Sequence, residues 1–392
     1  MARADTRPIV IVGAGIGGLT AALALLRAGF PVVVAEQAAA LGELGAGLTL
    51  APNGSRVLEA LGLGERLRRI ASLPGIGAIR HWRTGEAFST SDRGGAAARF
   101  GAPYCQVHRA DLHAILAEAV LAYGPHRLLL DHRFAGCLDE GGAVGVRFAN
   151  GATLDARSLI GADGARSAVR AQLLNASSPE FTGYCAWRGL APVAALPPGT
   201  LDYPSCLYVG PHRMFARYLV RGGELVNFVA AVREPRWRLE SWSARGDPAE
   251  VLAAFAGFHA PVRAILGAVP PDSLHKWALY SREPLLQWVA GRVGLLGDAA
   301  HPMLPFMGQG AVMAIEDAMV LARAFAAEPD DPAAALARYQ RARLERATLV
   351  QRQSAARGLA LLAADPDDYG RRPTVNEDTL GLFEYDATAV AV

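Results

Sequence analysis

The N-terminal part of the chain alternates between short apolar runs and turn-forming residues. Residues 9–12 are a β-branched run that ends at Gly13, which is typical of a parallel strand buried on both faces. Residues 19–27 then predict a helix that Gly29 ends. A second apolar run at 30–35 predicts the next strand. This order of strand, turn, helix and strand predicts a Rossmann-like unit.

Further elements of both kinds follow later in the chain. Apolar runs at 158–161 and 293–296 predict two more buried strands. Residues 104–116 predict a helix with Arg109 close to its start, and residues 308–310 open a long amphipathic helix. These elements extend the α/β pattern well beyond the first unit.

The middle of the chain has a different pattern. Residues 181–231 alternate between apolar and polar positions around a hairpin-like turn at 221–223, which predicts an antiparallel sheet with one open face. From residue 332 onward the pattern is helical, and we expect the last dozen residues to be loosely held. The chain therefore predicts an α/β fold with a Rossmann-like domain, an antiparallel-sheet domain for substrate and a C-terminal helical segment.

The turn after the first strand reads GAGIGG and has the spacing of a dinucleotide-binding loop. Gly13 permits the tight turn, Gly15 lets backbone N–H groups approach a pyrophosphate, and Gly18 allows close packing of helix on strand. Glu36 ends the second strand, 18 residues after Gly18, where an acidic residue binds an adenosine ribose. A carboxylate there disfavours a 2′-phosphate. The motif alone does not distinguish FAD from NAD.

Two further motifs favour FAD. Asp163 follows the strand at 158–161 as part of a DG pair. Asp298 follows the strand at 293–296 as part of a GD pair, ahead of the helix that opens near Gly310. A strand end, a carboxylate and a helix N-terminus are thereby placed together, which indicates a second edge that contacts a ligand.

With these three motifs in this order, the chain resembles the class A FAD-dependent aromatic hydroxylases of the para-hydroxybenzoate hydroxylase type. The resemblance spans nearly the whole chain. The stretches 45–53, 297–318 and 382–387 look most similar to the salicylate, 3-hydroxybenzoate and 6-hydroxynicotinate hydroxylase branch. In such a fold the FAD-binding domain is assembled from separate pieces of chain.

This resemblance implies the domain boundaries and the cofactor contacts. Glu36 would hold the adenosine ribose, Arg109 would lie along the ribose and phosphates, and Asp298 would bind the ribityl hydroxyls. Asp163 would contact both FAD and the reduced nicotinamide. The isoalloxazine ring would be flanked by residues 45–48, including Gly47 and Leu48, and by the loop 305–311, including Gly310 and Ala311. The boundaries are 1–72, 103–175 and 275–331 for the FAD-binding domain, 73–102 and 176–274 for the substrate domain, and 332–392 for the C-terminal helical region.

The activity that the resemblance implies is hydroxylation of a small aromatic substrate, of the hydroxybenzoate or hydroxypyridine carboxylate type, with NAD(P)H and O2 through a flavin C4a-hydroperoxide. The chain has no second dinucleotide motif, so NADH or NADPH is expected as a transient co-substrate. The stretch after Glu36 lacks Arg and Lys, which favours NADH. Three alternatives remain: a hydroxylase or epoxidase of larger polyketide- or quinone-like substrates, a flavin oxidase, and a non-catalytic flavoprotein.

Four residues are candidates for the chemistry. Tyr218 aligns with a family tyrosine and is expected to orient the substrate or relay its proton, unless it is a core aromatic. Relatives that use a His four positions earlier have Met214 here, which puts a His-assisted mechanism in doubt. His212, predicted to share a strand face with Met214, and Gln309 are the other candidate activating groups. Pro305 is expected to fix backbone carbonyls near the reacting edge.

Composition and cysteine usage narrow the partners and the location. The 39 basic and 37 acidic residues give a net charge of +2, which is too balanced for nucleic-acid binding. The uncharged stretch 8–26 holds four central glycines and therefore favours a buried strand and helix over a membrane span. Four scattered cysteines predict reduced thiols in a cytoplasmic protein with no metal site. We expect a monomer or homodimer.

The flavin is expected to be held without a covalent bond. No Cys or His lies beside the flavin motifs in a recognisable attachment motif. His301, three residues after Asp298, is the nearby nucleophile to examine.

Overall fold

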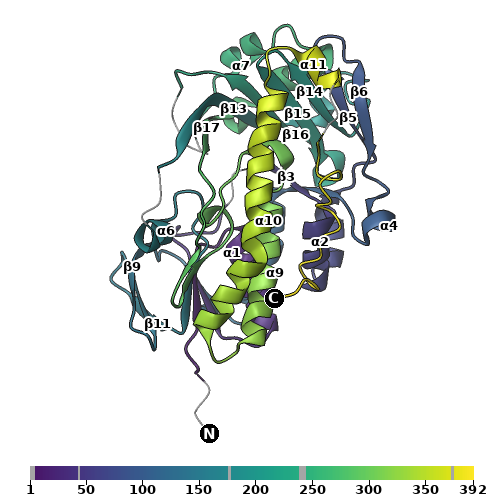
Figure 1. Ribbon diagram of the computed structural model, residues 1–392. Coiled ribbons are helices and arrows are strands. Elements are labelled where there is room, and N and C mark those ends of the chain that lie inside the picture. The colour runs from purple at the N-terminus through teal and green to yellow at the C-terminus, as the bar shows by residue number, and fades with distance from the viewer. Residues whose placement is uncertain (1–4, 43–44, 175–177, 238–243, 372–374) are drawn as a thin grey trace.

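The computed structural model describes residues 5–42, 45–174, 178–237, 244–371 and 375–392. Two sheets lie at opposite ends of the molecule, and one long helix, α10 (Pro332–Leu361), runs along both (Figure 1). Asp331 caps this helix, because its carboxylate accepts hydrogen bonds from the backbone N–H groups of Ala333 and Ala334 at 3.1 Å.

The first sheet is six-stranded, in the order β18-β19-β12-β1-β2-β8. Its strands pair in parallel except for β18, which pairs antiparallel with β19 at the edge. All residues of β1 and β12 are buried, as their apolar sequences predict. The bounds are β1 Ile9–Val12, β2 Val32–Ala35, β8 Leu128–Leu129, β12 Ser158–Gly161, β18 Val289–Ala290 and β19 Val293–Leu295.

Three helices cover this sheet and share its core. The helix α1 (Ile16–Arg27) packs against both α5 (Arg109–Leu121) and α9 (Gly310–Ala327). In turn, α9 packs against α10 and α2 (Pro52–Ala60). The motif loops at the strand ends therefore meet the N-termini of helices that are fixed by a large apolar core.

The second sheet is seven-stranded, in the order β17-β13-β16-β15-β14-β5-β6. Its pairs are antiparallel except for β14 with β5, which are parallel. One face packs on α7 and α8 through a cluster that includes Phe215, Phe228 and Phe255. The bounds are β5 Ile76–His81, β6 Ala87–Asp92, β13 Glu180–Pro192, β14 Ser205–Gly210, β15 Arg213–Val220, β16 Leu225–Arg233, β17 His275–Ser281, α7 Pro248–Ala254 and α8 Ala260–Gly267.

Smaller elements complete the fold. One three-stranded sheet, β3-β7-β4, lies between the two large ones, and another, β11-β10-β9, lies beside the first sheet (Figure 1). The bounds are β3 Gly47–Leu50, β4 Ala71–Ser72, β7 Cys105–His108, β9 Phe134–Asp139, β10 Val144–Phe148, β11 Thr153–Ala156, α3 Gly64–Ile70, α4 Ala96–Phe100, α6 Ala168–Leu173 and α11 Pro366–Arg371.

The structure corrects two local expectations. Residues 105–108 form a strand and not the start of a helix, because they pair with β3, and α5 begins only at Arg109. The last dozen residues are not loosely held. Phe383 packs edge-on against Phe100 and Tyr104, and Leu382 and Ala387 are fully buried.

The division into a FAD-binding and a substrate domain stays a prediction, with one correction at a boundary. The strand β17 was assigned to the first domain, but it pairs with β13 and belongs to the seven-stranded sheet. We therefore propose that the substrate domain ends after residue 281, where the last piece of the FAD-binding domain begins, and not after residue 274.

Candidate active site

The three motifs meet at the carboxyl ends of neighbouring parallel strands. β1 leads into Gly13, β12 leads into Asp163, and β19 leads into Asp298. The backbone N–H of Ala162 donates to Val12 O at 2.8 Å, and that of Leu296 donates to Gly161 O at 2.9 Å. This edge is where ligands bind in open α/β sheets.

The glycine loop is as tight as the motif predicts. A Cβ on Gly18 would lie 2.0 Å from Gly13 O, so helix α1 approaches the strand more closely than a side chain allows. Gly13 has a φ of +105°, and its Cβ would lie 2.5 Å from Ala162 O. No side chain caps α1 at Gly15. Its first N–H groups and the positive end of its dipole are therefore available to a phosphate.

A cavity of about 560 Å³ runs from this loop to the open face of the seven-stranded sheet. Its volume lies in the range of ordinary ligand sites. Most of the predicted cofactor-binding residues line it, namely Gly15, Gly47, Leu48, Arg109, Asp298, Gly310 and Ala311. Pro305 and Tyr218, two of the predicted catalytic residues, line it as well.

Asp298 lines this cavity close to the start of α9. Its side chain is exposed, and Oδ1 is 4.0 Å from the position that a Cβ of Gly310 would take. The surrounding protein raises the pKa of Asp298, while the charges of His301, Arg109 and Arg170 oppose that shift. A carboxylate in this setting is a strong acceptor for hydroxyl groups of a bound ligand.

Four predicted cofactor residues do not line the cavity: Gly13 and Gly18 of the loop, Glu36 and Asp163. The carboxylate of Glu36 accepts hydrogen bonds from the N–H groups of Ala14 at 2.8 Å and Ala38 at 2.9 Å, so it holds the glycine loop. Asp163 caps helix α6, because it accepts from the Ser167 hydroxyl at 2.5 Å and the Ala168 N–H at 2.7 Å. The carboxylate of Asp163 therefore has a structural role at the start of α6, whatever it contacts in a ligand.

On the substrate side, the cavity is lined by residues that lie directly opposite one another on neighbouring strands of the seven-stranded sheet. We call these residues, Ser205, Tyr218 and Asn227, the row. Ser205 of β14 pairs with Tyr218 of β15, which pairs with Asn227 of β16. The Gly47 N–H donates to Asn227 Oδ1 at 2.6 Å, and a Cβ on Gly47 would lie 2.6 Å from the Tyr218 ring. The start of β3, at Gly47, therefore lies in direct contact with Tyr218 and Asn227.

Burial raises the pKa of Tyr218, and the nearby Tyr104 hydroxyl adds to this, although the Thr49 side chain opposes it. Tyr218 is therefore a neutral phenol at physiological pH. It can donate a hydrogen bond to a substrate oxygen, but it is a poor base. Of the two roles that the sequence left open, this favours orientation of the substrate over proton transfer.

The structure argues against the other two candidate activating groups. His212 lies in the turn before β15, with a φ of +54°, and its Nδ1 is 3.3 Å from Leu362 O. The expectation that it shares a strand face with Met214 was wrong, because the strand begins at Arg213. Gln309 is buried, and its Oε1 accepts from Asn53 Nδ2 at 3.2 Å. Neither side chain lines the cavity.

Sequence reasoning missed Asn227 and Arg93, which both line the cavity. Asn227 was detectable, because it is the single polar residue in the apolar run 225–232. Its Nδ2 is buried, and no residue in the described part of the chain accepts from it. Arg93 carried no such signal, because arginine is the common basic residue of this chain.

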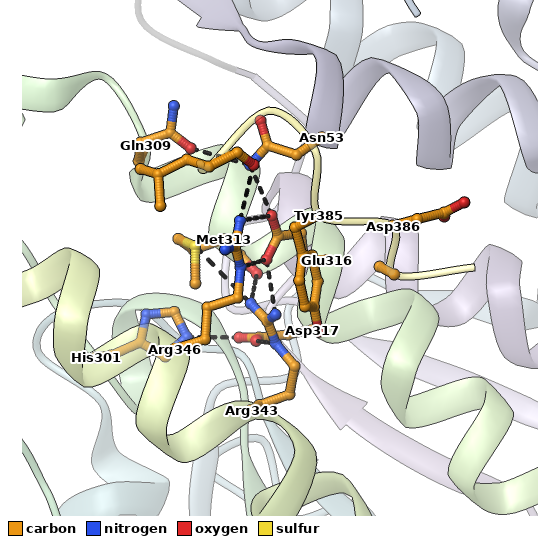
Figure 2. Close-up of polar contacts among 12 residues, drawn as sticks. Asn53, His301, Gln309, Met313, Glu316, Asp317, Arg343, Arg346, Tyr385 and Asp386 are labelled. Carbon is orange, nitrogen blue, oxygen red and sulfur yellow. Dashed lines mark hydrogen bonds and ion pairs between the residues drawn. The ribbon is translucent and has the colours of Figure 1, made fainter. Parts of the chain in front are cut away.

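A buried network of ion pairs links α9 to α10 (Figure 2). Arg343 of α10 pairs with Glu316 through Nη1 and with Asp317 through Nε, both at 2.7 Å, and all three side chains are fully buried. Asp317 also accepts from His301 Nε2 at 2.5 Å, which ties the loop after Asp298 to the middle of α9. The helix whose N-terminus faces the cavity is thereby fixed in position.

Comparison with known proteins agrees with this geometry. The family model of the FAD binding domain matches residues 6–354. This chain belongs to that FAD-binding family. It is 41% identical over 355 residues to a 3-amino-4-hydroxybenzoate 2-monooxygenase of Streptomyces platensis, which covers 89% of this chain and 87% of the relative. It is 40% identical over 351 residues to a 6-hydroxynicotinate 3-monooxygenase of Bordetella bronchiseptica, with 88% and 90% covered.

Solved structures are also similar to this chain. Klebsiella pneumoniae HpxO complexed with FAD and uric acid has a TM-score of 0.85 and 28% identity, with 97% of this chain and 96% of that chain covered. A salicylate hydroxylase substrate complex has a TM-score of 0.81 and 26% identity, over 97% and 96%. The resemblance drawn from the sequence motifs and the predicted FAD-binding fold are confirmed. None of the helices in the described segments has both the length and the apolar character needed to cross a bilayer.

Proposed function

We propose that this protein is an FAD-dependent monooxygenase that uses NAD(P)H and O2 to hydroxylate a small aromatic carboxylate, of the hydroxybenzoate or hydroxypyridine carboxylate type. The observation that carries the proposal is the single cavity that joins the dinucleotide loop to the row containing Tyr218 and Asn227. The curated relatives support the substrate class, since they are monooxygenases of an aminohydroxybenzoate and a hydroxynicotinate.

The residues present fit FAD. The uncapped N-terminus of α1 at Gly15 suits the pyrophosphate, and Arg109 lies beside Asp298 on the same wall. Asp298 supplies an acceptor for the ribityl hydroxyls. The backbone of Gly47 and the start of α9 at Gly310 border the space for the ring. FAD, once reduced by NAD(P)H, supplies the activation of O2 that the reaction needs.

The chain itself orients and activates the substrate. The neutral Tyr218 hydroxyl can donate a hydrogen bond to the phenolic oxygen of the substrate, which stabilises its deprotonated and more reactive form. Asn227 Nδ2, on the next strand, is a donor with no acceptor among the described residues. The α9 helix has no side-chain cap at Gln309, so its N-terminal dipole favours negative charge at the cofactor edge. Met214, Leu207 and Val229 give the wall an apolar part that excludes water.

The proposal is tested by a screen with the purified yellow protein. 3-Amino-4-hydroxybenzoate, 3-hydroxybenzoate, salicylate and 6-hydroxynicotinate are each added with NADH or NADPH, and both cofactor oxidation and products are measured. Faster NAD(P)H oxidation with a hydroxylated product supports the proposal. Substrate-dependent peroxide without such a product supports a flavin oxidase instead. No effect from any ring, with turnover of a larger quinone, contradicts the proposed substrate class.

Tyr218→Phe is expected to lower kcat for hydroxylation roughly tenfold or more and to divert O2 to peroxide, because the substrate oxygen loses its hydrogen-bond donor. FAD binding and flavin reduction should persist. The measurements are product formed per NADH oxidised and single-turnover flavin reduction. Tyr208→Phe is the matched control, since Tyr208 lies on the same sheet but faces the α7 and α8 side. An unchanged rate and coupling in Tyr218→Phe would make Tyr218 a structural residue.

We also expect the flavin to be bound without a covalent link. His301, the nucleophile that follows Asp298, is 1% exposed and is paired with Asp317, so it does not face the cavity. Acid precipitation should therefore release all of the flavin into the supernatant. A pellet that stays yellow after washing would show a covalent bond and contradict this expectation.

The finer points of partners and location are proposals too. We propose a cytoplasmic monomer or homodimer with no nucleic-acid or membrane partner, supported by the balanced charge and the four free cysteines. Light scattering on the purified protein and fractionation of producing cells test this. A membrane-bound fraction or a higher oligomer would contradict it.

A further inference from the structure

The far end of the cavity, beyond Tyr218, contains a cation that the activity described so far does not use. Arg93 follows β6, the edge strand of the seven-stranded sheet, and lines the cavity. Its Nε and Nη1 atoms are buried, and no residue in the described segments accepts a hydrogen bond from either. Two buried donors without an acceptor on a half-buried guanidinium are unfavourable unless a ligand supplies the acceptor.

Arg93 is held in position by its neighbours. Its guanidinium lies 4.2 Å from the centroid of the buried Tyr104 ring, which is a favourable cation–π distance. It also lies over Gly77, where a Cβ would be only 3.2 Å from Arg93 Nε. The missing side chain at Gly77 therefore makes room for the guanidinium on the cavity face of the sheet.

The spacing between Arg93 and Tyr218 suits one substituted ring. Gly77 pairs with Ser205, and Ser205 pairs with Tyr218, so the position of Arg93 lies two strands away from Tyr218 in the same row. Neighbouring strands are about 4.8 Å apart, which makes the separation along the sheet roughly 10 Å. That width admits an aromatic ring whose oxygen meets Tyr218 and whose opposite substituent meets Arg93.

A second guanidinium with an unmatched donor lies at this end. Arg357 of α10 also lines it, with a buried Nε that has no acceptor among the described residues, while its Nη1 donates to Val375 O at 2.8 Å. The carboxylates of Asp92, Glu377 and Asp378 line this end too, and Asp378 is paired with Arg99 at 3.2 Å. Within the described segments neither Arg93 nor Arg357 forms an ion pair with these carboxylates, so their buried donors remain for a ligand carboxylate.

We propose that Arg93 is the residue that recognises the carboxylate of the aromatic substrate, and so sets the preference for aromatic acids over neutral rings. This inference rests on the proposed function, because it assigns one contact within that substrate class. A guanidinium can bind a carboxylate through two parallel N–H donors, and such charge-assisted pairs are among the stronger polar contacts.

The test compares each acid with its amide, which has nearly the same shape and no charge. Binding to the FAD-loaded protein is measured by calorimetry with 3-hydroxybenzoate and 3-hydroxybenzamide, 6-hydroxynicotinate and 6-hydroxynicotinamide, and 3-amino-4-hydroxybenzoate and its amide. For the acid that wild type binds most tightly, Arg93→Gln should raise Kd about 10- to 100-fold while Kd for the amide changes less than about twofold.

Two further variants make the result specific. Arg83→Gln is the matched control, because Arg83 lies in the β5–β6 turn with its guanidinium 4.5 Å from the Trp82 ring but outside the cavity lining. It should leave both affinities unchanged. Arg357→Gln tests the neighbouring cation, and a loss of acid selectivity there but not in Arg93→Gln would overturn the assignment.

The remaining outcomes are equally decisive. If the ratio of Kd for the acid to Kd for its amide is unchanged in Arg93→Gln, the inference is overturned. A variant that binds NADH more weakly but binds the acids as wild type does also overturns it. Equal weakening of acid and amide, with normal FAD content, also overturns it. If wild type binds none of the acids, the proposed substrate class fails, and the carboxylate contact fails with it.

Discussion

Replacing Arg343 with methionine is expected to lower the free energy of unfolding by about 3–5 kcal/mol, because the substitution leaves two buried carboxylates without their shared cation. Glu316 and Asp317 are both fully buried, and Arg343 contacts each of them at 2.7 Å. Tyr385 lies against the same guanidinium, with 5.2 Å between the cation and the ring centroid (Figure 2). Methionine fills part of the volume and supplies no charge.

Urea unfolding of the FAD-loaded protein measures this effect. Arg341→Met is the matched control, since Arg341 lies two residues away on the exposed side of α10 and should change the free energy of unfolding by less than about 0.5 kcal/mol. A loss below 1 kcal/mol in Arg343→Met would show that Arg346 and His301 alone compensate the carboxylates.

Acid provides a second readout of the same network. Burial raises the pKa of Asp317, but the charges of His301 and Arg343 outweigh it and lower the value to about 2. The stabilisation is therefore fully present above the unfolded-state pKa of about 3.9 and is lost as the pH falls towards 2. Arg343→Met should show a shallower fall in stability over this pH range than wild type.

Asp298→Ala is expected to raise the Kd for FAD roughly 10- to 150-fold, which corresponds to charge-assisted hydrogen bonds worth about 1.5–3 kcal/mol. The carboxylate lines the cavity near the start of α9, and the other acidic lining residues in the described segments, Asp92, Glu377 and Asp378, lie at the Arg93 end. The apoprotein is titrated with FAD, and the quenching of flavin fluorescence gives Kd.

Two further variants show whether the loss of FAD affinity comes from the Asp298 carboxylate itself or from a disturbed fold. Asp155→Ala removes an exposed carboxylate on β11 and should leave Kd unchanged. Asp298→Asn keeps an acceptor without the charge, so it should fall between wild type and Asp298→Ala. An FAD affinity equal to that of wild type in Asp298→Ala would remove this residue from the cofactor site.

The dinucleotide-binding end could be predicted from the sequence because its physics is local. A buried strand, a glycine turn and a helix start are contiguous, and Gly13 and Gly18 have the close contacts that the motif requires. The GD pair was likewise predictable, since it follows its strand directly. Neither inference depended on how distant parts of the chain pack.

The substrate end depended on long-range pairing. Gly77, Ser205, Tyr218 and Asn227 come together only through the register of four strands. A one-residue error in a strand boundary placed His212 on a face that it does not occupy. The position of Arg93 depends on Tyr104 from a different part of the chain, and nothing in the local sequence distinguishes it from other arginines. Side-chain chemistry at this end therefore required the fold.

The role of Asp163 shows a third kind of limit. A DG pair after a strand predicts a ligand contact and a helix cap equally well, because both use a carboxylate at a helix N-terminus. The structure shows the capping bonds to Ser167 and Ala168. A second role towards FAD or the nicotinamide stays a prediction.

The most direct test of the central claim is turnover under ¹⁸O₂ with the aromatic acid that the screen selects. We expect one ¹⁸O atom in the new hydroxyl group of the product and one product molecule for each NAD(P)H oxidised. A product that carries oxygen only from water, or NAD(P)H oxidation that yields peroxide with no oxygenated product from any of the acids, would contradict the assignment of this protein as an aromatic monooxygenase.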